Sequence, residues 1–96
     1  MKKTDKQELY ALILGASSGF GEATAIRLAK DGFNILGVHL DRQATMHNVE
    51  RIIREIESAG VDAKFFNANA ADEIKRKGII HEIKSYLNGK PLIKVI

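Results

Sequence analysis

The stretch Leu12-Ile13-Leu14-Gly15-Ala16-Ser17-Ser18-Gly19-Phe20-Gly21-Glu22 determines the fold predicted for the whole chain. An apolar run rich in strand formers, Tyr10 to Leu14, stops at Gly15. Two hydroxyl residues and two more glycines follow, and helix-forming residues begin at Glu22. A strand, a tight turn and a helix N-terminus in this order direct backbone N–H groups and the positive end of a helix dipole toward one point. The stretch therefore predicts an anion-binding turn.

The glycines and serines of this turn have separate expected roles. Gly15 lets the chain leave the strand, Gly19 lets the backbone approach a pyrophosphate, and Gly21 lets the helix pack closely on the sheet. The two serines are expected to donate to the phosphate or to cap the helix. The predicted ligand is a dinucleotide, and its expected contacts in the turn are Gly15, Ser17, Ser18, Gly19, Phe20 and Gly21.

The spacing Gly-x-x-x-Gly-x-Gly differs from the common dinucleotide fingerprint Gly-x-Gly-x-x-Gly. A P-loop is excluded because Glu22 stands where that motif requires a lysine. The pattern resembles the Thr-Gly-x-x-x-Gly-x-Gly signature of the short-chain dehydrogenase/reductase family, with Leu14 in place of the leading threonine. The resemblance implies NAD or NADP as cofactor. It also implies an oxidoreductase that moves hydride between nicotinamide and a carbonyl, an alcohol or an activated double bond of a small-molecule substrate.

Strands and helices are expected to alternate along the rest of the chain, and each helix ends at a glycine followed by an apolar strand. The expected strands are residues 10–14, 33–40, 61–67 and 92–96, and the expected helices are residues 22–30, 44–59 and 72–88. This alternation predicts a parallel sheet with right-handed crossovers. The predicted fold is therefore α/β, a single domain with a doubly wound sheet of strand order 3-2-1-4, helices on both faces and a crevice between strands 1 and 4.

A second candidate site follows the second strand. Asp41 comes about twenty residues after Gly21, the usual offset for a carboxylate that binds ribose hydroxyls, and Arg42 could face a 2′-phosphate. Counting by the family's pattern instead places His39 at the acidic position and Leu40 at the basic one. The choice between NAD and NADP therefore stays open, and a helix-capping role for Asp41 is the alternative.

A third match follows the third strand. Asn69-Ala70-Ala71-Asp72 resembles the family's Asp-Val-Thr-Asp stretch, which implies that Asn69 and the amide of Ala70 meet the adenine ring. An asparagine amide suits a heteroaromatic edge because it both donates and accepts. Asp72 is expected to cap the next helix.

Tyr86 and Lys90 reproduce the family's catalytic Tyr-x-x-x-Lys spacing, but Asn88-Gly89 is expected to break the helix between them. The pair also precedes the last strand, whereas the family's pair lies beyond the next one. No catalytic residue is therefore predicted in this chain. The three histidines are isolated from other ligand types at helical spacing, so no metal site is predicted.

Composition limits the classes of partner. The chain has 96 residues, no cysteine and a net charge of +3, with its basic residues scattered among 12 acidic ones. Nucleic-acid binding is therefore not expected, since no aromatic residues interleave with the basic ones. No apolar run approaches the roughly 18 residues of a membrane span, so a soluble cytoplasmic protein is expected.

The resemblance covers residues 8–96 and corresponds only to the amino-terminal part of the family's domain. The sequence stops inside an apolar strand, which suggests a truncated portion of a longer dehydrogenase or reductase, itself inactive. A stand-alone dinucleotide-binding or regulatory module is the alternative. Because the strand at residues 92–96 would have an uncovered edge, homo-oligomerisation is expected.

Overall fold

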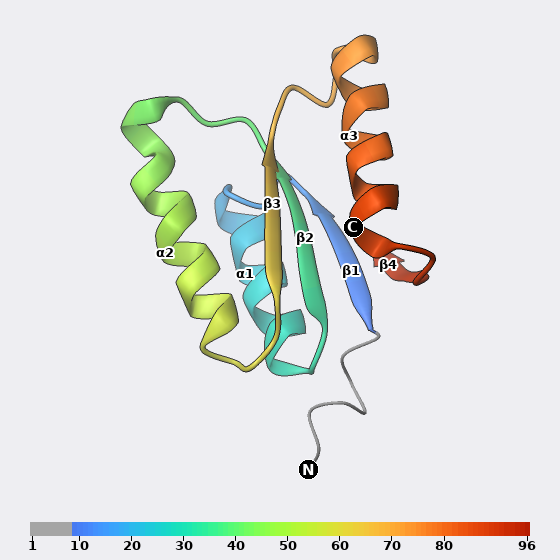
Figure 1. Cartoon of the computed structure of the whole chain (residues 1–96). Coiled ribbons are helices and arrows are strands. Elements are labelled where there is room, and N and C mark those ends of the chain that lie inside the picture. The colour runs from blue at the N-terminus through green and yellow to red at the C-terminus, as the bar shows by residue number, and fades with distance from the viewer. Residues whose placement is uncertain (1–8) are drawn as a thin grey trace.

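The computed structural model describes residues 9–96 and contains the expected alternation of strands and helices (Figure 1). Its elements are β1 (Tyr10–Leu14), α1 (Gly19–Lys30), β2 (Asn34–His39), the short 3-10 helix η2 (Gln43–Thr45), α2 (Met46–Glu57), β3 (Ala63–Asn67), α3 (Glu73–Leu87) and β4 (Leu92–Val95).

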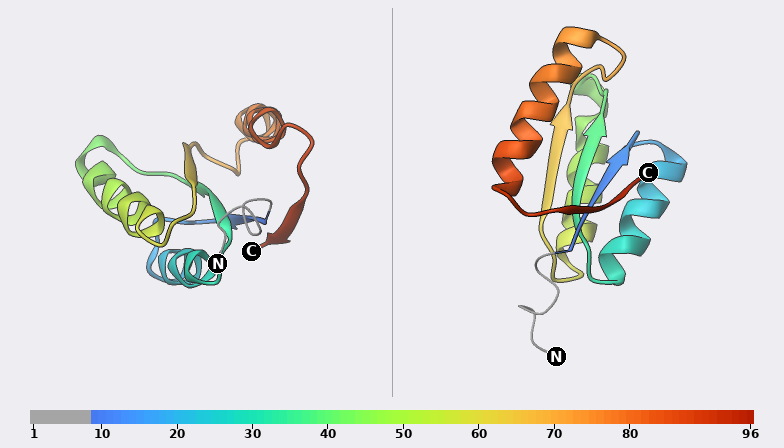
Figure 2. Two further views of the ribbon diagram at one scale, coloured as in Figure 1. Left: turned by 60° about the horizontal axis from the view of Figure 1, so that its bottom comes forward. Right: turned by 90° about the vertical axis from the view of Figure 1, so that its right-hand side faces the viewer.

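The four strands form one parallel sheet in the order β3-β2-β1-β4, which confirms the predicted topology. Helices α1 and α2 cover one face of the sheet, and α3 covers the other (Figures 1 and 2). The carboxyl ends of β1, β2 and β3 lie together at one end of the sheet, because the strands are parallel. The loops that follow these strand ends carry the site predicted from the sequence.

Each face of the sheet has its own apolar core. Small side chains of α1 let this helix lie close to the sheet, whereas α2 and α3 contribute bulky ones. The core under α1 and α2 contains Ala11, Ile13, Ala16, Ala25, Ala29, Ile35, Ile52 and Ile56. The core under α3 contains Tyr10, Leu36, Val38, Phe66, Ile79, Ile83 and Leu87. Ile80, next to the buried Ile79 on α3, is exposed.

Two helix starts differ from those expected from the sequence. Helix α1 begins at Gly19 rather than at Glu22, because tertiary contact with the sheet overrides the low helix propensity of glycine. The region expected to open the second helix forms η2 instead, and α2 itself starts at Met46.

The predicted ends of the first and third helices are confirmed, whereas α2 ends at Glu57, two residues before the predicted end. Gly32, just beyond α1, has a φ of +100°. Asp72 caps α3, since its carboxylate accepts a hydrogen bond of 3.0 Å from the Lys75 N–H. Asn88 adopts the left-handed conformation directly after α3, with a φ of +49°.

Strand β4 lies at one edge of the sheet and presents apolar side chains to solvent. On its inner side the N–H of Ile96 donates to the Leu12 carbonyl at 2.9 Å, and the N–H of Leu14 donates to the Ile96 carbonyl at 2.8 Å. Ile93, Val95 and Ile96 are exposed, and an exposed apolar edge strand is a template for pairing with another chain.

Self-association through β4 stays a prediction. Sedimentation equilibrium should show a dimer or larger species of the chain at micromolar concentration. Val95→Lys, which places a charge on the exposed edge, should shift the equilibrium toward monomer. A wild-type chain that remains strictly monomeric would contradict the expectation.

Candidate functional site

The turn between β1 and α1 is held by backbone hydrogen bonds and by one glycine in a left-handed conformation. Gly15 has a φ of +71°, which L side chains rarely adopt. Its N–H and that of Ala16 donate to the Val38 carbonyl at 2.9 and 3.1 Å. The expected role of Gly15 as the residue at which the chain leaves the strand is confirmed.

The N-terminus of α1 carries no side-chain cap. Ser18 precedes the helix, but its hydroxyl donates to the Gly15 carbonyl at 2.7 Å, so the expectation that a serine caps α1 is wrong. The first N–H groups of a helix have no partner within it. Because no side chain caps them, the positive end of α1 suits a bound anion.

The two glycines in the first turn of α1 differ sharply in their surroundings. A Cβ atom on Gly21 would lie 1.9 Å from the carbonyl oxygen of Gly15, so the helix touches the turn there and Gly21 is needed for packing. A Cβ atom on Gly19 would meet nothing within 4 Å. The space next to Gly19 is thus open.

Asp41 is held against the glycine turn. The Ser17 hydroxyl donates to Oδ1 of Asp41 at 2.5 Å, and Nδ1 of His39 lies 3.0 Å from the same oxygen. The hydrogen bond from Ser17 lowers the pKa of the Asp41 carboxyl despite its partial burial, with smaller contributions from Thr45 and His39. Asp41 is therefore ionised at neutral pH, and since a carboxylate only accepts, Nδ1 of His39 must carry the proton.

Asp41 does not directly precede either of the two helices that follow β2. Arg42 precedes η2, and Thr45 precedes α2. The helix-capping alternative for Asp41 is therefore wrong. The Arg42 side chain is exposed, and no hydrogen bond or ion pair of its guanidinium occurs within residues 9–96.

Asn67, the last residue of β3, is a contact that the sequence did not predict. Its Oδ1 accepts a hydrogen bond from the Asp41 N–H at 3.0 Å, and its Nδ2 donates to the Asp41 carbonyl at 3.0 Å. The two residues are 26 positions apart, so no local pattern could reveal the contact. The sequence does hold a weak signal, since two adjacent strands end in polar residues, β2 in His39 and β3 in Asn67.

A hollow of about 150 Å³ lies at the carboxyl ends of β1, β2 and β3. Leu14, Gly15, Val38, His39, Leu40, Ala68 and Ala70 line it. Ala70 thus reaches the predicted site. Asn69 is exposed and is not among the lining residues, and its Oδ1 accepts a hydrogen bond from the Ala71 N–H at 2.9 Å.

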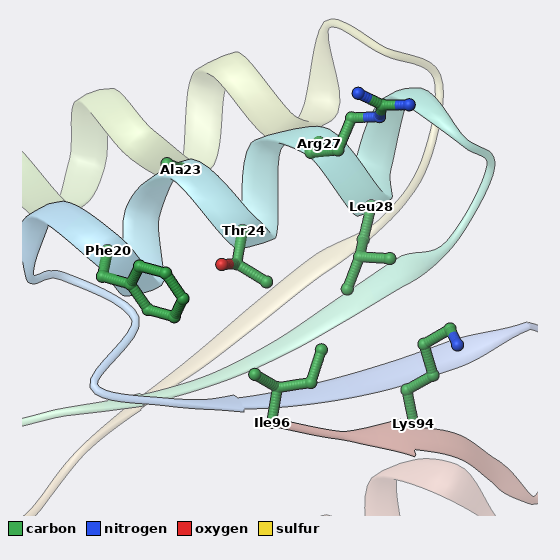
Figure 3. A pocket seen from close by; sticks show the side chains of 7 residues that line it. All are labelled: Phe20, Ala23, Thr24, Arg27, Leu28, Lys94 and Ile96. Atoms are coloured by element: carbon green, nitrogen blue, oxygen red, sulfur yellow. The ribbon is translucent and has the colours of Figure 1, made fainter.

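A larger apolar hollow of about 400 Å³ lies between α1 and β4 (Figure 3). Phe20, Thr24 and Leu28 of α1 face Ile96, the residue directly after β4, across it. Phe20 is 81% exposed. Its side chain lines this hollow and not the smaller one at the carboxyl ends of β1, β2 and β3.

Tyr86 and Lys90 lie on either side of the helix end at Leu87, as predicted. The Lys90 ammonium lies 5.8 Å from the centre of the Tyr10 ring. Burial raises the pKa of the Tyr86 hydroxyl, and Asp62 and Tyr10 raise it further, whereas Lys90 alone lowers it. A proton-transferring tyrosine of the family's kind requires a shift in the opposite direction.

Within residues 9–96, no group of three or more histidine, cysteine or acidic side chains could hold a metal ion. None of the helices described is both long and apolar enough to cross a membrane.

The fold and the site together define a class of protein. A doubly wound parallel sheet, a glycine turn at an uncapped helix N-terminus and a carboxylate after the second strand are the features of a dinucleotide-binding domain. The chain belongs to the short-chain dehydrogenase family, whose profile, described as short chain dehydrogenase, matches residues 9–91. It corresponds to the amino-terminal Rossmann portion of that family.

Individual relatives agree with this assignment. A 3-oxoacyl-[acyl-carrier-protein] reductase of Staphylococcus aureus is 35% identical over 80 residues, which cover 83% of this chain and 31% of the reductase. A short-chain dehydrogenase/reductase of Armillaria gallica is 33% identical over 83 residues, which cover 86% of this chain and 31% of that protein. The chain therefore spans less than a third of the length of these relatives.

Solved structures share the fold. NAD⁺-bound xylitol dehydrogenase superposes with a TM-score of 0.75 at 22% identity, over 86% of this chain and 30% of the other. Acetoin dehydrogenase from Enterobacter cloacae superposes with a TM-score of 0.76 at 20% identity, over 92% of this chain and 33% of the other.

Proposed function

We propose that this chain holds the ADP half of a nicotinamide dinucleotide within a longer oxidoreductase of the family. Its matched relatives are about three times as long, which supports a role as the cofactor-binding portion. In that protein, hydride would pass between nicotinamide and a carbonyl, an alcohol or an activated double bond of a small-molecule substrate. The groups that act on the substrate would belong to the remaining part of the protein.

The observation that carries the proposal is the hydrogen bond between Ser17 of the glycine turn and Asp41. It joins an anion-binding turn to a carboxylate that suits ribose hydroxyls. The N–H groups at the start of α1 would bind the pyrophosphate, with Gly19 allowing close approach. The hollow lined by His39, Leu40 and Ala70 would receive the adenine ring, and Asn69 at the loop above β3 would donate to its edge through Nδ2.

We further propose NAD rather than NADP as the cofactor. Asp41 is an ionised carboxylate at the expected ribose position, and a 2′-phosphate placed beside it would meet a like charge. NAD supplies a hydride donor or acceptor, while this chain's own residues bind and orient its adenosine end.

The proposal is tested by titrating the chain with ADP, which carries the adenine, ribose and pyrophosphate groups and no nicotinamide. Two-dimensional NMR detects even weak binding. Gly19→Ala should weaken ADP at least about tenfold, because a methyl group fills the open space where the phosphates approach. Gly78→Ala is the matched control, since a Cβ atom there also meets nothing within 4 Å but lies on α3.

The choice of cofactor is tested by the same titration with adenosine 2′-phosphate 5′-diphosphate (2′-phospho-ADP), which differs from ADP only in its 2′-phosphate. It should bind at least about tenfold more weakly than ADP, since like charges at a binding site cost free energy. A wild-type chain that fails to bind ADP would refute the proposed function. Equal binding of ADP by wild type and Gly19→Ala would remove the turn from the site, and tighter binding of 2′-phospho-ADP would reverse the cofactor choice.

A further inference from the structure

The loop between β2 and α2 is fixed by hydrogen bonds rather than by packing. None of its residues 40–45 is buried, and Leu40 is 68% exposed. Apolar burial therefore contributes little to its conformation. Asp41 nevertheless has defined partners for both its backbone groups and its side chain.

The backbone partner of Asp41 is a single side chain. The Asn67 amide accepts from the N–H of Asp41 and donates to its carbonyl, each at 3.0 Å. Asn67 pairs with His39 in the parallel ladder, and the N–H of Ala68 donates to the His39 carbonyl at 2.8 Å. The asparagine amide thus resembles an extra peptide group that extends the β2–β3 pairing by two residues into the loop.

The side chain of Asp41 is held from the opposite direction. Ser17, 24 positions away on the glycine turn, and His39 both bond its Oδ1. Only 12% of the Asp41 side chain and 2% of the His39 side chain are exposed, so the carboxylate is confined between β2, β3 and the turn. A shift of the Asp41 backbone would break these side-chain contacts, because hydrogen bonds weaken steeply with distance and angle.

We propose that Asn67 is a positioning residue for cofactor choice, which holds Asp41 where its carboxylate rejects a 2′-phosphate. This inference rests on the proposed function and adds a residue to it. Without the amide, the loop can move away from the turn, and the like charge that opposes the 2′-phosphate moves with it. The backbone hydrogen bonds of the pyrophosphate turn involve neither Asn67 nor Asp41, so the turn keeps its geometry when the bond from Ser17 is lost.

The test compares the affinities of ADP and 2′-phospho-ADP in wild type, Asn67→Ala and Asp41→Ala. Asn67→Ala should lower the preference for ADP at least about threefold, the effect of losing one or two hydrogen bonds, and in the direction of Asp41→Ala. Asn67→Thr places a polar strand former there, but its single hydroxyl oxygen cannot replace both the acceptor and the donor atom of the amide, so it should behave as Asn67→Ala does. In the double variant with Asp41→Ala, the change at Asn67 should have no further effect on the preference.

A second readout separates positioning from loss of stability. In Asn67→Ala the pKa of the Asp41 carboxyl, followed by carbon NMR, should rise toward its ordinary value because the bond from Ser17 loosens. Asn48→Ala is the control, since it removes an asparagine amide that contacts Arg51 on α2 and leaves Asp41 untouched.

The outcomes for the two proposals differ. If wild type binds ADP and rejects 2′-phospho-ADP, but both Asn67 variants keep that preference and the low pKa of Asp41, the positioning role is refuted and the proposed function stands. If wild type binds neither nucleotide, the proposed function itself fails.

Discussion

Replacing Gly21 by alanine is expected to lower the free energy of unfolding by more than about 4 kcal/mol, which few single substitutions do. The new Cβ atom would lie 1.9 Å from the carbonyl oxygen of Gly15 and 2.7 Å from its carbonyl carbon. Both atoms belong to the backbone of the turn, so no side-chain rotation relieves the contact. Helix α1 would have to move off the sheet and expose Ala25 and Ala29, which are buried beneath it.

Urea unfolding followed by circular dichroism measures this effect. Gly19→Ala and Gly78→Ala are the matched helical controls, and each should change stability by less than about 1 kcal/mol, since alanine is favoured over glycine in a helix and meets no neighbour. If Gly21→Ala unfolds at the same urea concentration as Gly19→Ala, the close contact between α1 and the turn is wrong. If the prediction holds, two glycines only two residues apart have different roles: Gly21 is needed for folding and Gly19 for ligand binding.

The second large effect is expected at Gly37, in the middle of β2. A Cβ atom there would lie 2.8 and 2.9 Å from two ring carbons of Phe65 and 2.9 Å from Cβ of Ala16. Ala16, the residue directly after Gly15 in the glycine turn, is fully buried and cannot yield. Gly37→Ala should therefore cost about 1–3 kcal/mol, the usual range for overpacking a core.

A double-mutant cycle with Phe65→Leu tests the physical reason. The smaller side chain removes the ring carbons, so the pair of substitutions should destabilise the chain less than the sum of the two single ones. Strict additivity would show that Gly37 and Phe65 are not in contact. The residual cost in the double variant measures the contact with Ala16.

Local patterns predicted the backbone of this protein well, because they depend on residues close in sequence. Gly15, Gly32 and Asn88 adopt positive φ values at the predicted breaks, and Asp72 caps α3. The alternation of elements was sufficient for the sheet order, since short right-handed crossovers leave few arrangements. Helix starts were predicted less well, because α1 begins on glycines that only contact with the sheet makes helical.

The same distinction between local patterns and tertiary contacts applies to the candidate site. The sequence by itself placed the glycine turn and marked Asp41, but it left His39 as a rival and capping as an alternative. Only the tertiary structure joined Ser17, His39 and Asn67 to Asp41, and only it showed that Gly37 makes room for Phe65. These contacts link residues that are far apart in the chain and meet through strand register and side-chain direction. Turn conformations arise from neighbouring residues, whereas the position of a carboxylate beyond the carboxyl end of a strand depends on how all the strands align.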